Sequence, residues 1–238
     1  MKVEGRNAVS ELLKSDTRVD RLLVKEDGDK TLAQIISLAR KRGVVVKFVK
    51  NEALNRESAT QHHQGVIAIC DDYQYSTVED ILALAEQRGE APFVVLLDGI
   101  EDPHNFGSII RVCECMGVHG IIFGKNRACT MNETVLKTSA GAANHMLIAK
   151  VTNINQEIEF LKKQGVWIYA CELGGKDITK TNFSGSVGIV IGSEGRGVSA
   201  LTKKLCDGVV TIPMKGHVNS LNASVATGII LWEVAKSR

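Results

Sequence analysis

Residues 93–111 read FVVLLDGIEDPHNFGSIIR, and this stretch decides the fold class. Its first five residues are all apolar, without the alternation of a strand that has one face in water, so they predict a strand covered on both faces. The polar loop that follows runs into a helix carrying Ile109, Ile110 and Val112. A buried strand that leads into a helix is the repeating unit of parallel α/β sheets.

The rest of the C-terminal two thirds repeats this unit. Helical patterns separate further apolar runs, which predict strands at 120–123, 147–149, 167–171, 188–191 and 209–212. The last predicted helix spans Ser220 to Lys236, with Leu221, Val225, Ile229 and Trp232 three or four residues apart. The sequence therefore predicts an α/β fold whose parallel sheet is flanked by helices.

The first part of the chain predicts a separate, small α/β unit over residues 1–72. Its expected helices and strands are Asn7–Lys14, Arg21–Lys25, Leu32–Arg42, Val44–Val49 and Gly65–Cys70. Thr77, with Asp80 three residues later, predicts a capped helix inside a polar connector. We therefore expect a small domain at 1–72, a linker at 73–91 and a larger domain at 92–238.

Composition excludes several classes of protein. The net charge of +2 over 238 residues is too small to indicate nucleic-acid binding by itself. The six cysteines contain no CxxC pair, so they predict free thiols in a reducing compartment and no metal site. No apolar stretch approaches the roughly 18 residues of a membrane span. We expect a cytoplasmic protein.

Ligands of doubly wound sheets bind beyond the carboxyl ends of the strands, so we expect the binding residues in the loops there. In loop 98–111, Asn105 is either a helix cap or a ligand contact. Arg111 lies among apolar residues, where a permanent charge calls for a phosphate or carboxylate partner. A plain surface salt bridge is the alternative for Arg111.

The second loop, 191–197, reads IGSEGRG, and its three glycines allow close approach of a ligand to the backbone. A tight turn would also explain these glycines. Because no Gly-Lys-Ser/Thr follows, the loop does not support an enzyme that depends on nucleoside triphosphates.

The third loop, 212–226, reads IPMKGHVNSLNASVA. Pro213 ends the strand because it has no N–H to donate. Ser220, Asn222 and Ser224 gather polar side chains at the start of the last helix, where one of them serves as a cap. Three such residues beside free helical N–H groups also predict a polar ligand.

Together and in this order, the three loops resemble the motifs of the SpoU (TrmH-type) family of RNA ribose methyltransferases, in the SPOUT superfamily. The first motif corresponds to Asn105 and Arg111, the second to 192–195, and the third to 212–214 with 220–226. Residues 4–9 and 63–66 resemble the substrate-binding extension of family members that act on ribosomal RNA.

The resemblance implies a C-terminal deep trefoil knot and S-adenosylmethionine as methyl donor, bound mainly through the backbone of Gly192, Ile212 and Leu221. It implies that the catalytic residues are Arg111, Asn105, Glu194, Ser220 and Asn222. The expected contacts to the substrate RNA are Arg6, Asn7 and His104. It also implies a homodimer, and it requires no metal ion.

The implied reaction is methylation of a ribose 2′-hydroxyl, and the resemblance favours a guanosine of 23S rRNA in the peptidyl-transferase region. Large-subunit ribosomal RNA is then the expected partner. A tRNA ribose methyltransferase is the nearest alternative. A non-catalytic RNA-binding protein of the same fold is a third possibility, against which the intact motif residues argue.

Overall fold

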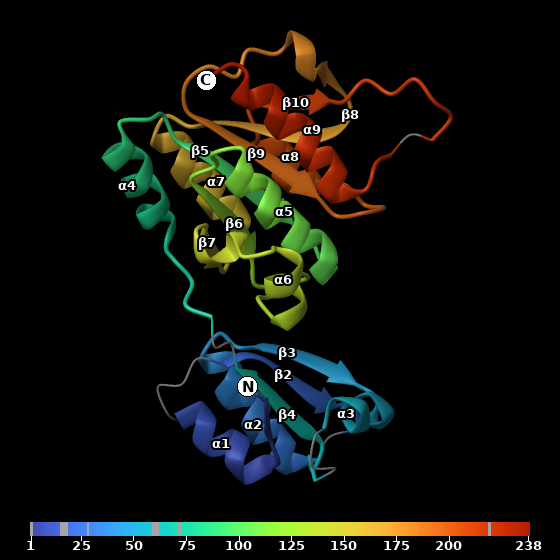
Figure 1. Ribbon diagram of the computed structural model, residues 1–238. Helices are drawn as coiled ribbons and strands as arrows, with labels where there is room; N and C mark the ends of the chain where they lie inside the picture. Colours follow the sequence, from blue (N-terminus) through green and yellow to red (C-terminus); the bar gives the residue numbers. More distant parts are fainter. Residues whose placement is uncertain (1, 15–18, 28, 59–61, 71–72, 219) are drawn as a thin grey trace. The chain divides into compact units, whose positions relative to one another are not determined.

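A computed structural model describes residues 2–14, 19–27, 29–58, 62–70, 73–218 and 220–238 (Figure 1). The chain divides into two compact units, residues 1–74 and 75–238. Each unit has its own sheet and its own buried core, and each is described by itself below.

The first unit is a four-stranded sheet with the strand order β1-β4-β2-β3. Its strands are β1 (Lys2–Glu4), β2 (Val19–Lys25), β3 (Val45–Val49) and β4 (Val66–Cys70). Its helices are α1 (Arg6–Lys14), α2 (Lys30–Lys41) and α3 (Asn51–Glu57). The sequence did not predict β1 or α3, because a three-residue strand and a seven-residue helix with one buried residue, Leu54, carry little periodicity.

The second unit is a six-stranded parallel sheet with the order β10-β8-β9-β5-β6-β7. Its strands are β5 (Phe93–Asp98), β6 (Gly120–Gly124), β7 (Leu147–Val151), β8 (Trp167–Asp177), β9 (Val187–Gly192) and β10 (Gly208–Thr211). Its α-helices are α4 (Val78–Arg88), α5 (Pro103–Cys115), α6 (Glu133–Thr138), α7 (Ile154–Lys163), α8 (Ala200–Leu205) and α9 (Ala223–Ala235), with short 3₁₀ turns η1 (Ala142–Asn144) and η2 (Ile178–Lys180). The predicted parallel sheet is confirmed; the trefoil knot stays a prediction.

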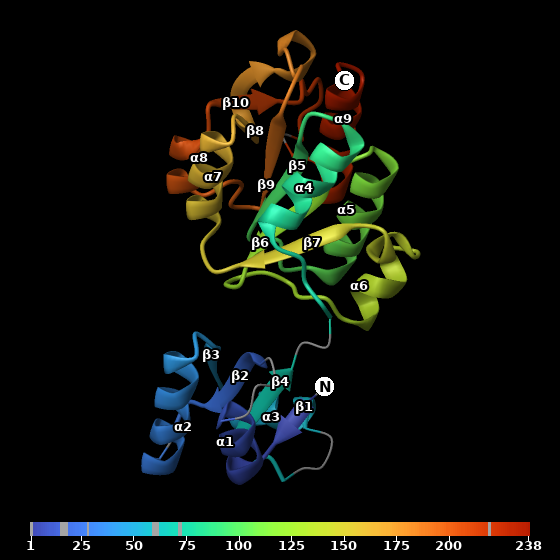
Figure 2. The ribbon, with the colours of Figure 1, turned by 90° about the vertical axis from the view of Figure 1, so that its left-hand side faces the viewer.

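Helices cover both faces of this sheet. Figure 2 shows α7 and α8 on one side of the strands, and α5 and α9 on the other. On the side of α7, Val94 and Leu96 of β5 pack with Ile158 in one buried cluster. The residues that alternate with these two along the strand, Phe93, Val95 and Leu97, are also buried. Burial on both faces explains why β5 shows no alternation in its sequence.

Helix α4 is part of the second unit and not of a free linker. Thr77 and Asp80 form the expected capping box at its start. The fully buried Ile81 then packs against the sheet so closely that a Cβ on Gly120 would lie 2.4 Å from its side chain. The polar ends of α4 suggested a connector over 73–91, whereas its buried side anchors most of that segment to the sheet.

The last helix begins at Ala223, later than the predicted Ser220. Asn222 is its N-cap, since the Asn222 side-chain oxygen accepts from the backbone N–H groups of Ser224 (3.0 Å) and Val225 (3.4 Å). Ser220 and Leu221 therefore stay in the loop, outside the helix. The first turn of α9 therefore makes no hydrogen bonds with the backbone groups of these two residues.

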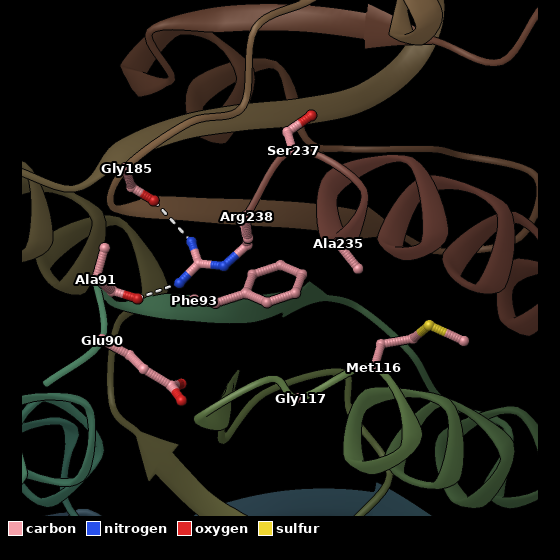
Figure 3. Close-up of a pocket in the computed structure, with 9 residues that line it drawn as sticks. All are labelled: Glu90, Ala91, Phe93, Met116, Gly117, Gly185, Ala235, Ser237 and Arg238. Atoms are coloured by element: carbon pink, nitrogen blue, oxygen red, sulfur yellow. Dashed lines mark hydrogen bonds between the residues drawn. The ribbon is translucent and has the colours of Figure 1, made fainter. Parts of the chain in front are cut away.

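A cavity of about 600 Å³ lies at the amino ends of β5 and β9, the sheet edge away from the loops of interest (Figure 3). The Arg238 guanidinium donates hydrogen bonds to the carbonyl groups of Gly185 (2.6 Å) and Ala91. It also lies over the Phe93 ring, 4.9 Å from the ring centre. These contacts tie the end of α9 to the start of two central strands, which is a structural role.

Next to this cavity, His119 is a buried histidine held in its neutral form. Its Nδ1 accepts the Phe93 N–H (3.0 Å), and its Nε2 lies 3.0 Å from a Glu90 carboxylate oxygen. Only 1% of His119 is exposed. Burial lowers the pKa of His119 below its ordinary value of 6.5, although Glu90 opposes this shift.

Acid should therefore destabilise the second unit through His119. Because the unfolded chain takes up this proton at a higher pH than the folded one, the free energy of unfolding falls as pH drops below about 6.5. The slope from this one group is at most about 1.4 kcal/mol per pH unit. Urea unfolding from pH 8 to 5.5 should show a shallower slope for His119→Asn than for wild type, and equal slopes would contradict the assignment.

Candidate active site

The three polar loops meet at the carboxyl ends of the strands, where a single carboxylate oxygen joins them. Glu194 Oε1 accepts from the side-chain amides of Asn105 (3.1 Å) and Asn222 (2.8 Å). The Asn222 amide also donates to the Asn105 side-chain oxygen at 2.8 Å. One residue from each predicted loop therefore takes part in a closed triangle of hydrogen bonds.

Local hydrogen bonds fix the backbone of Asn105 and the side chain of Asn222, independently of their contacts with Glu194. Asn105 is 8% exposed, on the first turn of α5, and its backbone N–H donates to the helix cap Asp102 at 2.8 Å. The Asn222 oxygen is occupied by the first N–H groups of α9, so its NH₂ group has to point toward Glu194 and Asn105. Helix capping thus sets the orientation of the triangle.

The glycine-rich loop folds back on itself at the end of β9. Ser193 and Gly197 exchange two backbone hydrogen bonds, of 3.2 and 2.9 Å. Gly192 lies so close to the returning chain that a Cβ there would be 2.1 Å from the Gly197 carbonyl carbon. A side chain at 192 would force the loop open, so glycine is required by packing.

This loop forms one wall of a cavity of about 410 Å³, a size typical of small-molecule sites. The three predicted donor-binding residues, Gly192, Ile212 and Leu221, all line it, as do Glu194 and Ser220. The full lining comprises residues 171–173, 191–197, 211, 212, 214, 220, 221, 223 and 226.

A smaller cavity of about 220 Å³ adjoins the first. It is lined by residues 99–102, Asn105, Ser193, Glu194 and Arg196. Because Ser193, Glu194 and Arg196 line both cavities, the hydrogen-bonded carboxylate stands at their common wall. Two adjoining cavities of unequal size suit a donor and an acceptor.

Arg111 lies outside this cluster. It is exposed on α5, six residues beyond Asn105, and it belongs to neither cavity lining. Within the described ranges, no hydrogen bond or ion pair engages its guanidinium. The intramolecular carboxylate that the sequence offered as one partner for Arg111 is therefore not seen in the described chain.

The predicted RNA contacts are spread over both units. His104 is exposed at the start of α5, and Asn7 is exposed on α1 of the first unit. Arg6 is already engaged, since its guanidinium pairs with Asp29 at 2.8 Å and donates to the Gln64 carbonyl at 3.0 Å. Arg6 therefore also connects the start of α1 to the start of α2 and to the segment before β4.

Sequence reasoning missed one wall of the larger cavity, which is formed by Cys171, Glu172 and Leu173 of β8. Gly174 and Gly175 directly after them were the available signal of an irregular strand. Burial raises the pKa of the Cys171 thiol to about 11, with a smaller contribution from Glu172. At neutral pH this thiol is protonated and a poor nucleophile.

Two other features are absent from the part of the chain that the structure describes. No helix there is long and apolar enough to cross a membrane. No group of three or more His, Cys, Asp or Glu side chains there could hold a metal ion.

Comparison with known families identifies both units. The model described as "SpoU rRNA Methylase family" matches residues 92–232, and the model "RNA 2'-O ribose methyltransferase substrate binding" matches residues 2–76. The chain belongs to the SpoU rRNA methylase family. The resemblance drawn from the three loops is confirmed, and the enzyme is an RNA ribose 2′-O-methyltransferase that uses S-adenosylmethionine.

Individual relatives support the assignment to this family. A Bacillus subtilis (strain 168) protein named for the TrmH family of tRNA/rRNA methyltransferases is 41% identical over 239 residues, which is 99% of this chain and 95% of the relative. The AdoMet-bound rRNA methyltransferase of Sinorhizobium meliloti shares the fold, with a TM-score of 0.59, 24% identity, and coverage of 99% of this chain and 86% of that one. The TrmH/SpoU tRNA-modifying enzyme of A. aeolicus has a TM-score of 0.57 and 29% identity, covering 63% and 76%.

The close approach at Gly192 gives a direct test of the larger cavity. Gly192→Ala should destabilise the fold by about 1–3 kcal/mol through overpacking and should weaken binding of S-adenosylmethionine, because the loop must open. Gly124→Ala is the matched control, since Gly124 ends the parallel strand β6 and a Cβ there meets nothing within 4 Å. Urea unfolding and titration calorimetry measure both effects; equal behaviour of the two variants would refute the packing argument.

Proposed function

We propose that this enzyme methylates the ribose 2′-hydroxyl of a guanosine in 23S rRNA, in the peptidyl-transferase region, and that it does so in the cytoplasm. The observation that carries the proposal is the hydrogen-bonded triangle of Asn105, Glu194 and Asn222, in which Glu194 lines both cavities. In this arrangement the larger cavity takes the methyl donor and the smaller one takes the acceptor ribose.

Ribosomal RNA is favoured over tRNA by the first unit. The substrate-binding family model covers residues 2–76, and the rRNA methyltransferase of S. meliloti covers 99% of this chain. The tRNA-modifying enzyme of A. aeolicus covers only 63%. A second unit for substrate binding suits a large, folded RNA, and the guanosine rests on the family resemblance.

The lining of the larger cavity fits S-adenosylmethionine. Gly192, Ile212 and Leu221 offer backbone groups and apolar surface, which suit an adenine recognised without charged side chains. Leu221 precedes α9, so its backbone remains available to a ligand. The bound donor supplies an already activated methyl group, and the residues of the chain have to position the acceptor oxygen and manage its proton.

Arg111 is the proposed catalytic cation. A permanently charged guanidinium is a poor general base, whereas its planar donors bind a phosphate and stabilise negative charge on an oxygen. Its exposure on α5 leaves it available to RNA. Weak acidity of the 2′-hydroxyl makes such stabilisation of the developing oxyanion valuable.

The hydrogen-bonded triangle is proposed to position the acceptor and the donor loops. Asn105 lines the smaller cavity, where it can hold the ribose, and Glu194 orients Asn105 and Asn222. Asn222 and Ser220 fix the loop before α9, with Ser220 in the wall of the larger cavity. Loss of any one of them should slow methyl transfer.

Arg6, Asn7 and His104 are proposed to contact the RNA. Asn7 and His104 are exposed and need no rearrangement. An RNA phosphate at Arg6 has to compete with Asp29, whose pKa is lowered mainly by the Leu32 N–H and also by Arg6. Phosphate contacts release counterions, so RNA affinity should fall as salt rises.

We also propose a homodimer through α9. One side of this helix is buried, but Val225, Ile229 and Trp232 leave 51%, 39% and 59% of their surface exposed at spacings of four and three residues. A contiguous apolar stripe of this kind marks an association surface. A second copy of the chain satisfies it by symmetry.

The function is tested in cells that lack the gene. We expect one 2′-O-methylguanosine to disappear from 23S rRNA, and wild type and Lys163→Ala to restore it while Arg111→Ala does not. Lys163→Ala is the control because it removes an exposed charge from α7, which covers the face of the sheet opposite to α5. In vitro, Arg111→Ala should lower the rate roughly 10²–10³-fold while binding S-adenosylmethionine normally.

Three results would contradict this assignment. A methylation that disappears from a tRNA would establish the tRNA alternative. Arg111→Ala protein that binds both ligands and methylates at the wild-type rate would remove Arg111 from the catalytic machinery. Titration of wild-type protein without any heat from S-adenosylmethionine would favour a non-catalytic RNA-binding protein.

The dimer is tested by a charge on the apolar stripe. Ile229→Glu should convert the protein to a monomer in light scattering coupled to size exclusion, because the carboxylate would be buried in the interface without a partner. Leu201→Glu is the control, since Leu201 is 59% exposed on α8, on the opposite face of the sheet. A monomeric wild type, or an Ile229→Glu dimer, would refute the proposal.

A further inference from the structure

Strand β8 leaves its regular pairing beside the larger cavity. Ala170 is paired with Val209 of β10, yet the next residue of β10, Val210, is paired with Lys176. Five residues of β8, 171–175, are therefore accommodated between two consecutive residues of β10 (the bulge). A bulge bends a strand and redirects its side chains, and this one brings residues 171–173 to the cavity wall.

Two glycines let the bulge close. Gly174 has a φ of +77°, which few residues other than glycine adopt easily. Gly175 lies against β10 so closely that a Cβ would be 2.6 Å from the carbonyl carbon of Val209. The sequence ELGG at 172–175 therefore places Glu172 at a defined point of the wall.

The Glu172 carboxylate links the bulge to the glycine-rich loop. Its Oε2 accepts the Val198 N–H at 2.9 Å, and its Oε1 accepts the Leu173 N–H at 3.2 Å. The Lys203 ammonium of α8 lies 3.9 Å from Oε2. The side chain is 20% exposed, so its hydrogen bonds are partly shielded from water.

Gly197 is shaped to this carboxylate. A Cβ on Gly197 would lie 2.2 Å from Glu172 Oε2, and its φ of +64° also favours glycine. The start of the loop is held by β9 and by the triangle at Glu194. Its end, residues 197–198, is held by Glu172.

We propose that Glu172 is a positioning residue for the methyl donor. It fixes the end of loop 192–198, so the loop backbone is already in place when S-adenosylmethionine enters the larger cavity. Preorganisation of this kind raises affinity, because a free protein with a mobile loop loses conformational entropy on binding. The inference rests on the proposed donor site and adds a residue outside the three family motifs.

Calorimetry on the full chain tests the role. Glu172→Ala should weaken S-adenosylmethionine roughly tenfold, the usual effect of losing one hydrogen bond to a charged group. Glu172→Gln should stay near wild type, since its amide oxygen still accepts the Val198 N–H. Glu159→Ala, an exposed carboxylate of α7, is the control.

Kinetics separates positioning from general damage to the fold. In Glu172→Ala, KM for the donor should rise while kcat at saturating donor and the Kd for RNA stay unchanged. A Gln variant as weak as the Ala variant would overturn the proposal, because charge rather than loop position would then matter. Wild-type affinity in the Ala variant would overturn it as well.

A double-mutant cycle keeps the test independent of stability. Gly197→Ala should weaken donor binding in wild type and weaken it less in the Glu172→Ala background, where the colliding oxygens are gone. Additive effects would overturn the proposed contact. If wild type itself does not bind S-adenosylmethionine, the proposed donor site fails, and that result is distinct from a failure at Glu172.

Discussion

The candidate active site depends on one carboxylate oxygen of Glu194, which accepts hydrogen bonds from the side chains of two other loops. Glu194 Oε1 is bound by the side chains of Asn105 and Asn222 and lies 3.4 Å from the Ala223 N–H. Hydrogen bonds to an ionised acceptor are stronger than those between neutral groups. The donors come from the starts of α5 and α9. This oxygen therefore fixes the positions of the two helix starts relative to each other, at the carboxyl end of the sheet. Both cavities take part of their wall from it.

The parallel sheet makes this convergence possible. The carboxyl ends of β5, β9 and β10 lie at one edge, so loops far apart in sequence emerge side by side. The strands are covered by helices on both faces and cannot shift easily (Figure 2). The loops are supported by this rigid sheet and pack closely, as the contact between Gly192 and Gly197 shows. The opposite edge carries the Arg238 and His119 contacts, which hold the strand starts.

The chemistry follows from this division between scaffold and loops. Much of the wall of the larger cavity is backbone and apolar surface, which suits the adenine of the proposed methyl donor. Its glycine-rich wall is held at both ends, by the triangle at Glu194 and by Glu172. Arg111 lies away from Glu194 and Glu172 and is exposed on α5, which agrees with the proposal that it binds RNA. In the proposed mechanism, the donor site is therefore held rigidly while the cation that meets the RNA stays exposed.

Local sequence was enough to predict the strands of the parallel sheet, the capped start of α4 and the three loops, because each depends on neighbours a few residues away. It also pointed to Asn105 and Asn222, the family resemblance added Glu194, and the structure brings the three together. It did not predict that α4 packs on the sheet through Ile81, or that β8 bulges to bring Glu172 against Val198. These features arise from contacts between residues distant in the chain, whose energies decide packing and register only once the strands are assembled. Residue type and spacing therefore determined which groups are available, and tertiary packing decided which of them touch.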